Sequence, residues 1–325
     1  MLAFLEKTTQ KLTQVDFPLQ SRVHPLNSFF TPHLQCYIKR DDELGSMGSK
    51  MRKFSALIPY LLKEKTDEAV VIGGMNSNHV LGIIQLLIEN GIEPSLFLCQ
   101  NHQEELKGNA LLIKLLIPES QIHCINRQEW PHVQATAEIY AKEKSSKKKV
   151  VIIPEGGCMP EAFPGALTLP CDIIHNEKKV GFSFQHFFVD SGTGLMAIGL
   201  ILGLAFLEHP GHVHVILIAG QHNEFLEKLK FYHQHFCSLM DYNCPWPTRF
   251  SLDKPQQTKA FGATSPRIFN AIRQIAQDEG VLCDPIYNAK LFLEAKRKIK
   301  EEMLDGKALI IHSGGTLSLL GFLPR

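Results

Sequence analysis

The sequence lacks the features that would place the protein in a specialised class. No stretch holds about 18 consecutive apolar residues, the length that a membrane-spanning helix needs. Neither sign of charge dominates, because 34 basic side chains stand against 33 acidic ones. We therefore expect neither nucleic acid nor a membrane as partner. The one strongly charged run, Lys142–Lys149, is interpreted as the solvated end of a helix. The N-terminal segment MLAFLEKTTQKLTQVD is too polar for a secretory signal, so we expect a cytoplasmic protein.

Paired cysteines and metal-ligand motifs are missing as well. The eight cysteines include no CxxC pair, and their spread over 325 residues predicts free thiols in a reducing compartment. His212 and His214 would share one face of a strand, and His233 and His235 flank a single residue. Neither pair has a nearby third ligand at a suitable spacing, so we expect no metal site.

What the sequence does have is a 44% apolar composition and a regular alternation of two kinds of segment. Short, continuously apolar runs predict buried strands over Ala69–Ile72, Ser95–Cys99, Val150–Ile153, Phe187–Val189, His214–Ala219 and Ala308–Ile311. Longer amphipathic stretches predict helices over Lys50–Lys63, Asn78–Glu89, Glu105–Leu116, Gly194–Leu207, Ser265–Glu279 and Ala289–Met303. The alternation indicates an α/β fold of about two domains, with parallel strands and helices on both faces.

Ligands of parallel sheets bind where strands turn into helices, and four of the predicted strands end in glycine-rich turns. The best phosphate cradle is Ser191–Gly194, because Ser191 and Thr193 offer hydroxyls at the start of a helix. A ligand-free connection is an equally good interpretation of this turn alone. The turn has neither the GK[ST] ending of a nucleotide loop nor the GxGxxG of a dinucleotide fold. A nucleotide-binding protein is therefore the last of our functional alternatives.

A second turn, Gly73–His79, is richer in side-chain donors. Ser77, Asn78 and the backbone amides at the start of the next helix could hold a carboxylate. Asn78 could instead be a plain N-cap, and His79 an ordinary first-turn residue. Two anion sites in one sheet would indicate a pair of ligands, one phosphorylated and one carboxylated.

These turns belong to a series of seven motifs that runs through nearly the whole chain. KRDD with GSKMRK is similar to KR[ED]D with GGNKTRK, GGMNSNH to GGxxSN[HQ], and KGNALLIKLL to GNxLLxxLL. PEGG with the later Gly165-Ala166, the SGTG turn, GVLCDPIYNAK and IHSGGTLSLLGF follow in order. With these motifs the chain resembles the pyridoxal-phosphate enzymes of the 1-aminocyclopropane-1-carboxylate deaminase and D-cysteine desulfhydrase family.

The resemblance implies an architecture. The family has the tryptophan-synthase-β-like fold (fold type II), with two open, twisted, mostly parallel sheets flanked by helices. It implies a smaller domain of residues 46–160 inserted into a larger, cofactor-binding domain of residues 1–45 and 161–325. It also implies a homodimer.

The resemblance further implies roles for the residues of the first two motifs. Lys50 would carry the cofactor, pyridoxal 5'-phosphate, and later move the α-proton of the substrate. Arg52 and Lys53 could supply the positive field that lowers the pKa of such a lysine, or Lys53 could reach the phosphate. Asn78 would face the phenolic oxygen of the cofactor. Ser77, Asn78 and His79 would bind the substrate, with Ser77 next to its carboxylate or its reacting carbon.

The later motifs complete the implied site. The phosphate cradle would consist of Ser191, Gly192, Thr193, Gly194 and Leu195. Asn288 and Ser313 would lie near the pyridine nitrogen, and Tyr287 could act as an acid or base towards the substrate.

Four departures from the family pattern affect the implied function. Ser49 replaces an asparagine, Phe261 replaces a tyrosine, the SGTG turn lacks a following Gly-Thr, and Asn288 replaces the glutamate of the ring-opening deaminases. Because an amide supports the electron-withdrawing ring less than a carboxylate does, we favour β-elimination from a D-cysteine-like amino acid. Deamination of 1-aminocyclopropane-1-carboxylate is the close alternative. A catalytically weak, cofactor-binding regulatory protein is the alternative from another class. His79 matches the desulfhydrase-like branch, since the deaminases have glutamine there.

Overall fold

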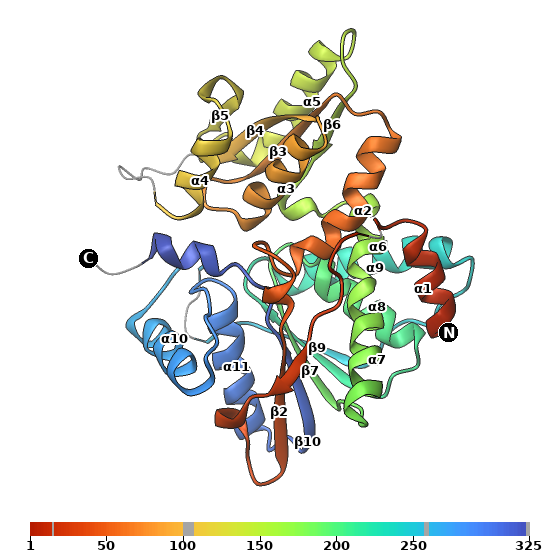
Figure 1. Cartoon of the computed structure of the whole chain (residues 1–325), viewed down its shortest axis with the longest axis vertical. Helices are drawn as coiled ribbons and strands as arrows, with labels where there is room; N and C mark the ends of the chain where they lie inside the picture. Colours follow the sequence, from red (N-terminus) through yellow and green to blue (C-terminus); the bar gives the residue numbers. More distant parts are fainter. Residues whose placement is uncertain (15, 100–106, 257–259, 323–325) are drawn as a thin grey trace.

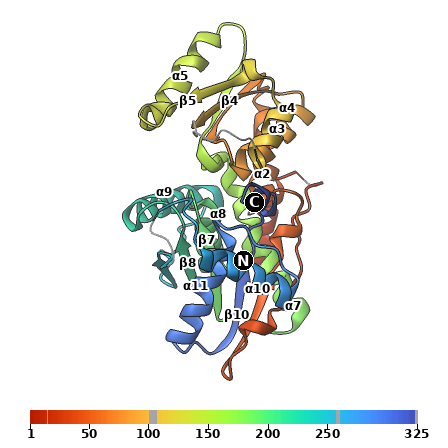
Figure 2. The ribbon, with the colours of Figure 1, turned by 90° about the vertical axis from the view of Figure 1, so that its left-hand side faces the viewer.

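The computed structural model describes residues 1–325 except 15, 100–106, 257–259 and 323–325. Its strands form one sheet of six strands and one of four. Figure 1 shows the four-stranded sheet above the six-stranded one, and the turned view of Figure 2 shows the same two lobes. The predicted class, α/β with two mostly parallel sheets flanked by helices, is confirmed.

The larger sheet has the strand order β1-β2-β10-β7-β8-β9. Its strands are β1 (Val23–Pro25), β2 (Leu34–Lys39), β7 (His186–Ser191), β8 (His212–Leu217), β9 (Phe250–Asp253) and β10 (Gly306–Ile311). All neighbours run parallel except the short edge strand β1, which is antiparallel to β2. The carboxyl ends of β7 and β10 therefore lie side by side.

The smaller sheet has the order β5-β4-β3-β6, and every pair in it is parallel. Its strands are β3 (Glu68–Gly74), β4 (Glu93–Cys99), β5 (Ile122–Ile125) and β6 (Val150–Ile153). Ala69 and Val71 of β3 face one apolar cluster, while Val70 and Ile72 face another, so this strand is apolar throughout. All four strands lie within residues 46–160, and the exact domain boundaries stay a prediction.

Helices cover both faces of the larger sheet. The helices are α1 (Leu2–Gln10), α2 (Lys50–Lys63), α3 (Asn78–Glu89), α4 (Asn109–Leu116), α5 (Val133–Lys144), α6 (Phe163–Ala166), α7 (Thr168–Val180), α8 (Leu195–Phe206), α9 (His222–Met240), α10 (Pro266–Glu279) and α11 (Asn288–Glu301). Residues of α8 share an apolar cluster with Phe187 and Val189, and residues of α11 share another with Phe188. Successive residues of β7 thus point to opposite layers.

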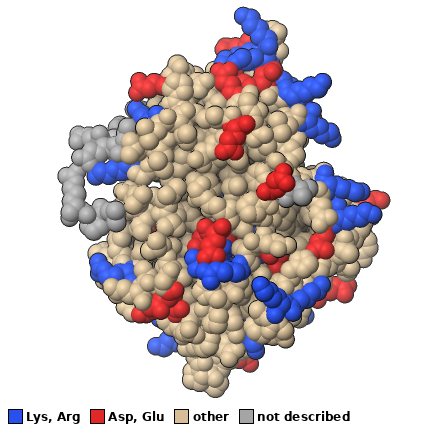
Figure 3. Space-filling view, viewed as in Figure 1, with Lys and Arg blue, Asp and Glu red and all other residues tan. Residues whose placement is uncertain are grey.

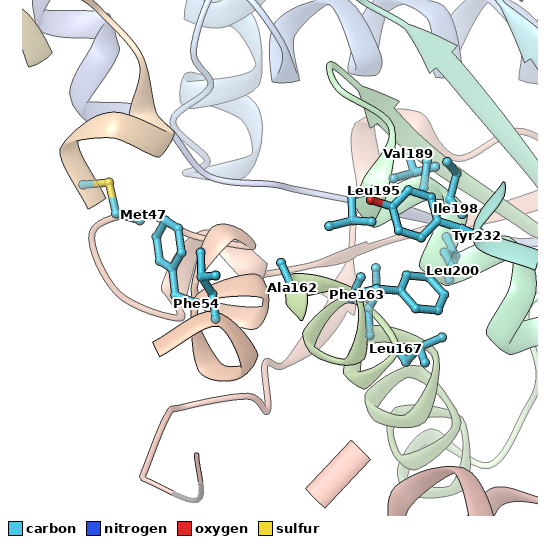
Figure 4. Close-up of a cluster of buried hydrophobic side chains, with 14 of the residues drawn as sticks. Met47, Phe54, Ala162, Phe163, Leu167, Val189, Leu195, Ile198, Leu200 and Tyr232 are labelled. Carbon is cyan, nitrogen blue, oxygen red and sulfur yellow. The ribbon is translucent and has the colours of Figure 1, made fainter. Parts of the chain in front are cut away.

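One apolar cluster continues from the smaller sheet into the larger one. Figure 4 shows part of it, with Phe163 of α6 next to Tyr232 of α9, whose ring centres are 5.1 Å apart. The short helix α6 also approaches α2 very closely. A Cβ atom on Gly165 would lie only 1.9 Å from the carbonyl oxygen of Arg52, so glycine is required there.

The predicted elements are largely present. Helices α2 and α3 and strand β6 have the predicted bounds, while α4 begins at Asn109 and the predicted start, Glu105, lies outside the described residues. Helices α1, α7 and α9 were not predicted. Each has many polar residues, and α7 contains Pro170 in its first turn, so their apolar stripes are narrow.

The basic run Lys142–Lys149 ends a helix, as predicted, but it is more than a solvated end. Lys144 and Lys148 pair with Glu68, whose side chain is fully buried, at 2.9 and 3.2 Å. Tyr140 donates a third bond to the same carboxylate. Burial disfavours the charge, but these partners prevail and lower the pKa of Glu68 to about 2. The run therefore ties α5 to the buried start of β3.

The surface agrees with the balanced composition. Figure 3 shows Lys and Arg side chains scattered among Asp and Glu on the face it displays, with no field of one sign. Among the described residues, none of the helices combines the length and the apolar character that crossing a bilayer requires.

Candidate active site

The candidate site lies where the turn after β10 meets the starts of α2 and α3. The backbone N–H of Ser49 donates to the carbonyl oxygen of Ser313 at 3.0 Å. A Cβ atom on Gly48 would lie 2.4 Å from that same oxygen, and one on Gly315 would lie 2.6 Å from Nδ2 of Asn78. Residues far apart in sequence are therefore in close contact, as the motif series predicts.

Lys50 is the first residue of α2, and its side chain is directed into this site. Its Nζ atom lies 5.9 Å from the ring centre of Tyr287. Burial lowers the pKa of Lys50, and the carboxyl groups of Asp190 and Asp284 oppose that shift. A lysine with a lowered pKa is more often neutral, which is the nucleophilic form that a carbonyl ligand requires.

Tyr287 stands at the start of α11, where its backbone N–H donates to Asp284 at 2.9 Å. Its ring lies over the turn of residues Ser191–Leu195, which we call the phosphate turn after its predicted ligand. A Cβ atom on Gly192 in this turn would be 3.2 Å from Tyr287 Cε1 and 3.3 Å from its hydroxyl oxygen. Burial, together with nearby carboxyl groups, raises the pKa of Tyr287, so the hydroxyl keeps its proton. Phe261 packs edge-on at 6.1 Å and is 60% exposed, so it covers the outer side of this ring.

The turn between β7 and α8 fits an anion. Gly194 has φ = +102° at the helix N-terminus, and no side chain caps the first turn of α8. The hydroxyl of Ser191 is buried, and among the described residues it has no hydrogen-bond partner. An uncapped helix start with an unused buried hydroxyl is what a phosphate group would complete. The five residues predicted as the cradle thus form one continuous turn.

Lys53 lies on the other side of the same turn. Its Nζ atom donates to the carbonyl oxygen of Gly156, and a Cβ atom on Gly156 would lie 2.7 Å from Thr193. Burial and the charge of Lys50 lower the pKa of Lys53 to about 8. The lysine is thus close to the phosphate turn, and one of its three donors is used by the backbone.

The start of α3 is arranged differently from a simple cap by Asn78. Ser77 is the N-cap, and its hydroxyl oxygen accepts from the N–H groups of His79 and Val80. Asn78 is instead buried, and its Oδ1 atom accepts from Asn109 Nδ2 at 2.7 Å. Asn109 thereby fixes the Asn78 amide, so that its Nδ2 lies beside Gly315. The N-cap interpretation of Asn78 is therefore wrong, because Ser77 has that role.

His79 is buried, and neither nitrogen of its ring has a hydrogen-bond partner in the part of the chain that the structure describes. The ring touches the turn after β6, since a Cβ atom on Gly157 would lie 2.7 Å from His79 Cε1. Burial and the charges of Lys53 and Lys50 hold the pKa of His79 well below its usual value. The imidazole is therefore neutral and offers one donor and one acceptor to a bound molecule.

Asn288 and Ser313 lie together, but the amide of Asn288 is fully used. Its Nδ2 donates to Asp284 at 2.7 Å and to the Gly314 carbonyl at 2.6 Å. Its Oδ1 accepts from the backbone N–H of Ser313 at 3.0 Å and from its hydroxyl at 3.4 Å. An amide has two donors and two acceptor positions, so all four are taken. Asn288 holds the turn after β10 in place.

Arg52 does not belong to this site, although the sequence indicated it as one source of a lowered pKa of Lys50. Its guanidinium is buried and bonds both carboxylate oxygens of Asp41, at 2.6 and 2.7 Å. A further bond of 2.7 Å goes to Asp172, which also pairs with Lys39. The lowered pKa of Lys50 comes from burial. The suggestion is therefore wrong for Arg52, whose charge is neutralised inside an ion network.

Two site residues, Asp190 and Asn109, were not singled out from the sequence. Asp190 follows the apolar run Phe187–Val189 in β7 and directly precedes Ser191, and its Oδ1 atom is buried without a partner. Ionisable residues are rare at the end of a buried strand, and this was the available signal. Asn109 lies within a motif that was recognised, but its contact with Asn78 depends on how α4 packs against α3.

The cysteines and the two histidine pairs are the remaining side chains that the sequence raised as candidates for special chemistry. All eight cysteines are free thiols, as predicted. His212 and His214 share one face of β8, with ring centres 4.7 Å apart. In the part of the chain that the structure describes, no three His, Cys, Asp or Glu side chains are arranged to hold a metal ion.

Three comparisons connect this geometry with known proteins. A family model described as "Pyridoxal-phosphate dependent enzyme" matches residues 18–314. A Pyrococcus abyssi protein named "Putative 1-aminocyclopropane-1-carboxylate deaminase" is 28% identical over 86% of this chain and 84% of its own length. The D-cysteine desulfhydrase of Serratia proteamaculans is 26% identical over 90% of this chain and 89% of its own. A crystal structure of an ACC deaminase homologue superposes with a TM-score of 0.87 at 25% identity, covering 99% of this chain and 98% of the other.

Proposed function

The chain belongs to the pyridoxal-phosphate dependent enzyme family, and from this premise we propose that it deaminates a small amino acid to a 2-oxo acid and ammonia. The favoured substrate is D-cysteine, which with one water gives pyruvate, ammonia and hydrogen sulfide. The close alternative is 1-aminocyclopropane-1-carboxylate, which with one water gives 2-oxobutanoate and ammonia. Relatives named for both activities cover most of the chain.

The residues of the site fit the cofactor. Lys50 would hold its aldehyde carbon, the Ser191–Leu195 turn and Lys53 its phosphate, and Asn78 its phenolic oxygen. The unused Ser191 hydroxyl and the uncapped start of α8 support this assignment. When bound, the cofactor supplies an electron-withdrawing ring next to the α-carbon of the substrate.

The chain's own residues then have separate tasks. Lys50 would take the proton from the α-carbon at its Nζ atom, for which a lowered pKa suits it. Tyr287 would donate the proton of its hydroxyl to the departing group, because its raised pKa keeps that proton in place. Phe261 and the buried walls around Tyr287 would exclude water from the reacting atoms.

The substrate would lie against the start of α3. The Ser77 hydroxyl can donate its proton to a carboxylate while its oxygen caps the N–H groups of His79 and Val80, and Asn78 stays fixed by Asn109. The neutral ring of His79 would contribute one donor and one acceptor at the other side. D-Cysteine is favoured because His79 is the residue of the desulfhydrase-like branch and because a thiol leaves with little assistance.

The observation that carries the proposal is the position of Lys50 beside Tyr287 and the phosphate turn. The purified protein, or the protein incubated with pyridoxal phosphate, should have a visible absorption band. Lys50→Ala should abolish this band, whereas Lys63→Ala, at the exposed end of the same helix, should leave it intact. A wild-type protein that never acquires the band would overturn the proposal.

A substrate panel separates the alternatives. Sulfide and ammonia release from D-cysteine would support the favoured reaction, and 2-oxobutanoate from 1-aminocyclopropane-1-carboxylate would support the close alternative. A coloured protein that turns over neither of them, nor L-cysteine or other small amino acids, would indicate the regulatory, cofactor-binding alternative.

We also propose that the enzyme works in the cytoplasm as a homodimer. The free thiols support the location, and the family resemblance supports the dimer.

A further inference from the structure

Asp190 is a partly buried carboxyl group, with one fully buried oxygen, that the proposed mechanism leaves without a role. It is the penultimate residue of β7, so it lies between the apolar residues of that strand and the phosphate turn. Its Oδ1 atom is buried and accepts no hydrogen bond. A buried carboxyl oxygen without a partner is costly, and such a group is found where a ligand completes its bonding.

The surroundings of Asp190 belong to the cofactor site. The Ser313 hydroxyl and the charges of Lys50 and His312 favour its ionised form, whereas Asp284 disfavours it. Burial outweighs the favourable groups and raises the pKa of Asp190. A cationic neighbour placed against the free oxygen would restore the charge of this carboxyl.

Asn288 is a poor partner for such a cation. Its amide is neutral, both of its donors are taken by Asp284 and Gly314, and its oxygen already accepts from the backbone N–H of Ser313. The Ser313 hydroxyl has one proton, which it can give to Asn288 or to Asp190. In either case one oxygen of Asp190 accepts no hydrogen bond from the described residues, and this free acceptor is a carboxylate oxygen.

We propose that Asp190 faces the pyridine nitrogen of the bound cofactor and keeps it protonated. The inference rests on the proposed function only in requiring that pyridoxal phosphate binds. The nitrogen is opposite the carbon that Lys50 would hold on the ring, and Asp190 adjoins both the phosphate turn and Ser313. A carboxylate is a recurrent partner of this nitrogen in enzymes that use the cofactor, because it stabilises the protonated, electron-withdrawing ring.

This role of Asp190 changes the argument about which of the two candidate substrates the enzyme uses. The amide at Asn288 argued against opening a cyclopropane ring, because it cannot hold the nitrogen protonated. With Asp190 in that role the electronic objection disappears. The choice between D-cysteine and 1-aminocyclopropane-1-carboxylate then depends on the substrate-binding residues at the start of α3.

The test compares pyridoxal phosphate with its analogue in which CH replaces the ring nitrogen. Dissociation constants of both are measured for the wild type, Asp190→Asn and the control Asp278→Asn, an exposed carboxyl on α10. Losing a charge-assisted bond should weaken binding of pyridoxal phosphate by about 10- to 100-fold. The analogue should bind Asp190→Asn and the wild type equally, and the control should match the wild type with both ligands.

Three outcomes overturn the inference and are distinguishable from failure of the proposed function. If Asp190→Asn weakens both ligands equally, Asp190 acts through Lys50 or the fold. If it weakens neither, Asp190 has no role toward the cofactor. If Asp190→Asn does not fold and the wild type binds both ligands with equal affinity, a charged partner of the nitrogen is excluded as well. In all three the wild type still binds pyridoxal phosphate with a visible band, whereas absence of that band would refute the proposed function itself.

Discussion

The Nζ atom of Lys50 lies 5.9 Å from the centre of the Tyr287 ring, and the ring in turn lies over Gly192 of the phosphate turn. An amine and a phenol thus lie close together beside the turn that we propose binds the phosphate. Burial lowers the pKa of the first and raises that of the second. One group is therefore suited to accept a proton and the other to donate one.

Replacing Tyr287 by phenylalanine should separate chemistry from cofactor binding. Tyr287→Phe removes only the hydroxyl, so we expect kcat to fall by about 100-fold or more, in the range of a lost general acid. The visible band of the bound cofactor should persist. Steady-state kinetics and absorption spectra measure the two effects, with the exposed Tyr242→Phe as control. Unchanged turnover of the Tyr287 variant would remove it from the mechanism.

Lys53 should make phosphate binding depend on pH. Its pKa of about 8 in the free protein should rise when a phosphate dianion binds, so the bound state takes up a proton. Affinity should therefore fall as the pH rises above about 8. Pyridoxine 5'-phosphate, which has no aldehyde, is the suitable probe because Lys50 cannot link to it covalently. Lys53→Gln should bind it more weakly and lose this pH dependence; a wild type with flat affinity across this range would contradict the role.

The parts of this site that could be predicted are those marked by short sequence motifs. Ser77 and the Ser191–Leu195 turn stand in glycine-rich motifs at the ends of apolar runs, which are visible in the sequence. Lys50 stands in a motif that the family resemblance singled out. The direction in which a side chain points cannot be predicted from such motifs. Arg52 is two residues from Lys50 on the same helix, yet it faces the opposite side of α2 because successive residues are about 100° apart. Its partners Asp41 and Asp172 come from distant segments, and no spacing rule connects them.

The hydrogen-bond partners of Asp190 and Asn288 could not be predicted from the sequence for the same reason. The sequence predicted that position 288 lies in the cofactor site, and the structure adds that its amide is committed to Ser313 and Asp284. Asp190 ends an apolar run, and its importance becomes visible only when its oxygen is found buried and unbonded. Hydrogen-bond satisfaction is a property of the whole packed structure.

The buried network around Arg52 should contribute strongly to stability. Arg52→Met leaves Asp41 and Asp172 buried with fewer partners, so we expect a loss of about 3–5 kcal/mol in the free energy of unfolding. Arg22→Met removes an exposed pair with Glu43 and should cost no more than about 1 kcal/mol. Urea unfolding measures both. Equal effects of the two changes would show that the buried network has no special weight.

The same network predicts a pH dependence with a defined sign. Burial opposes ionisation of Asp41, but Arg52, Lys39 and Ser21 prevail and lower its pKa in the folded state. Its stabilising contribution is therefore complete above the unfolded pKa of about 4 and is lost as the pH falls further. The stability difference between wild type and Arg52→Met should narrow below about pH 4. A constant difference down to pH 2 would contradict this assignment.

Gly165 should tolerate no side chain. Gly165→Ala places a Cβ atom 1.9 Å from the Arg52 carbonyl oxygen, so α6 must move away from α2. We expect destabilisation of about 3 kcal/mol or more, at the upper end of overpacking effects. Gly74→Ala is the control, because its Cβ would meet nothing within 4 Å. Thermal unfolding of both variants is the measurement, and a Gly165 variant as stable as the control would show that the helix contact is not tight.

His79 should influence the choice of substrate. Its neutral ring presents one donor and one acceptor without partners, and a glutamine has the same two functions on a longer, flexible chain. His79→Gln should therefore keep the cofactor band but change the ratio of kcat/KM for D-cysteine to that for 1-aminocyclopropane-1-carboxylate. A shift of about 3- to 10-fold toward the cyclic substrate is expected, the size of one altered hydrogen bond. His132→Gln, an exposed histidine near α5, is the matched control. If the ratio stays the same while both activities fall together, His79 supports the fold of the site and does not select the substrate.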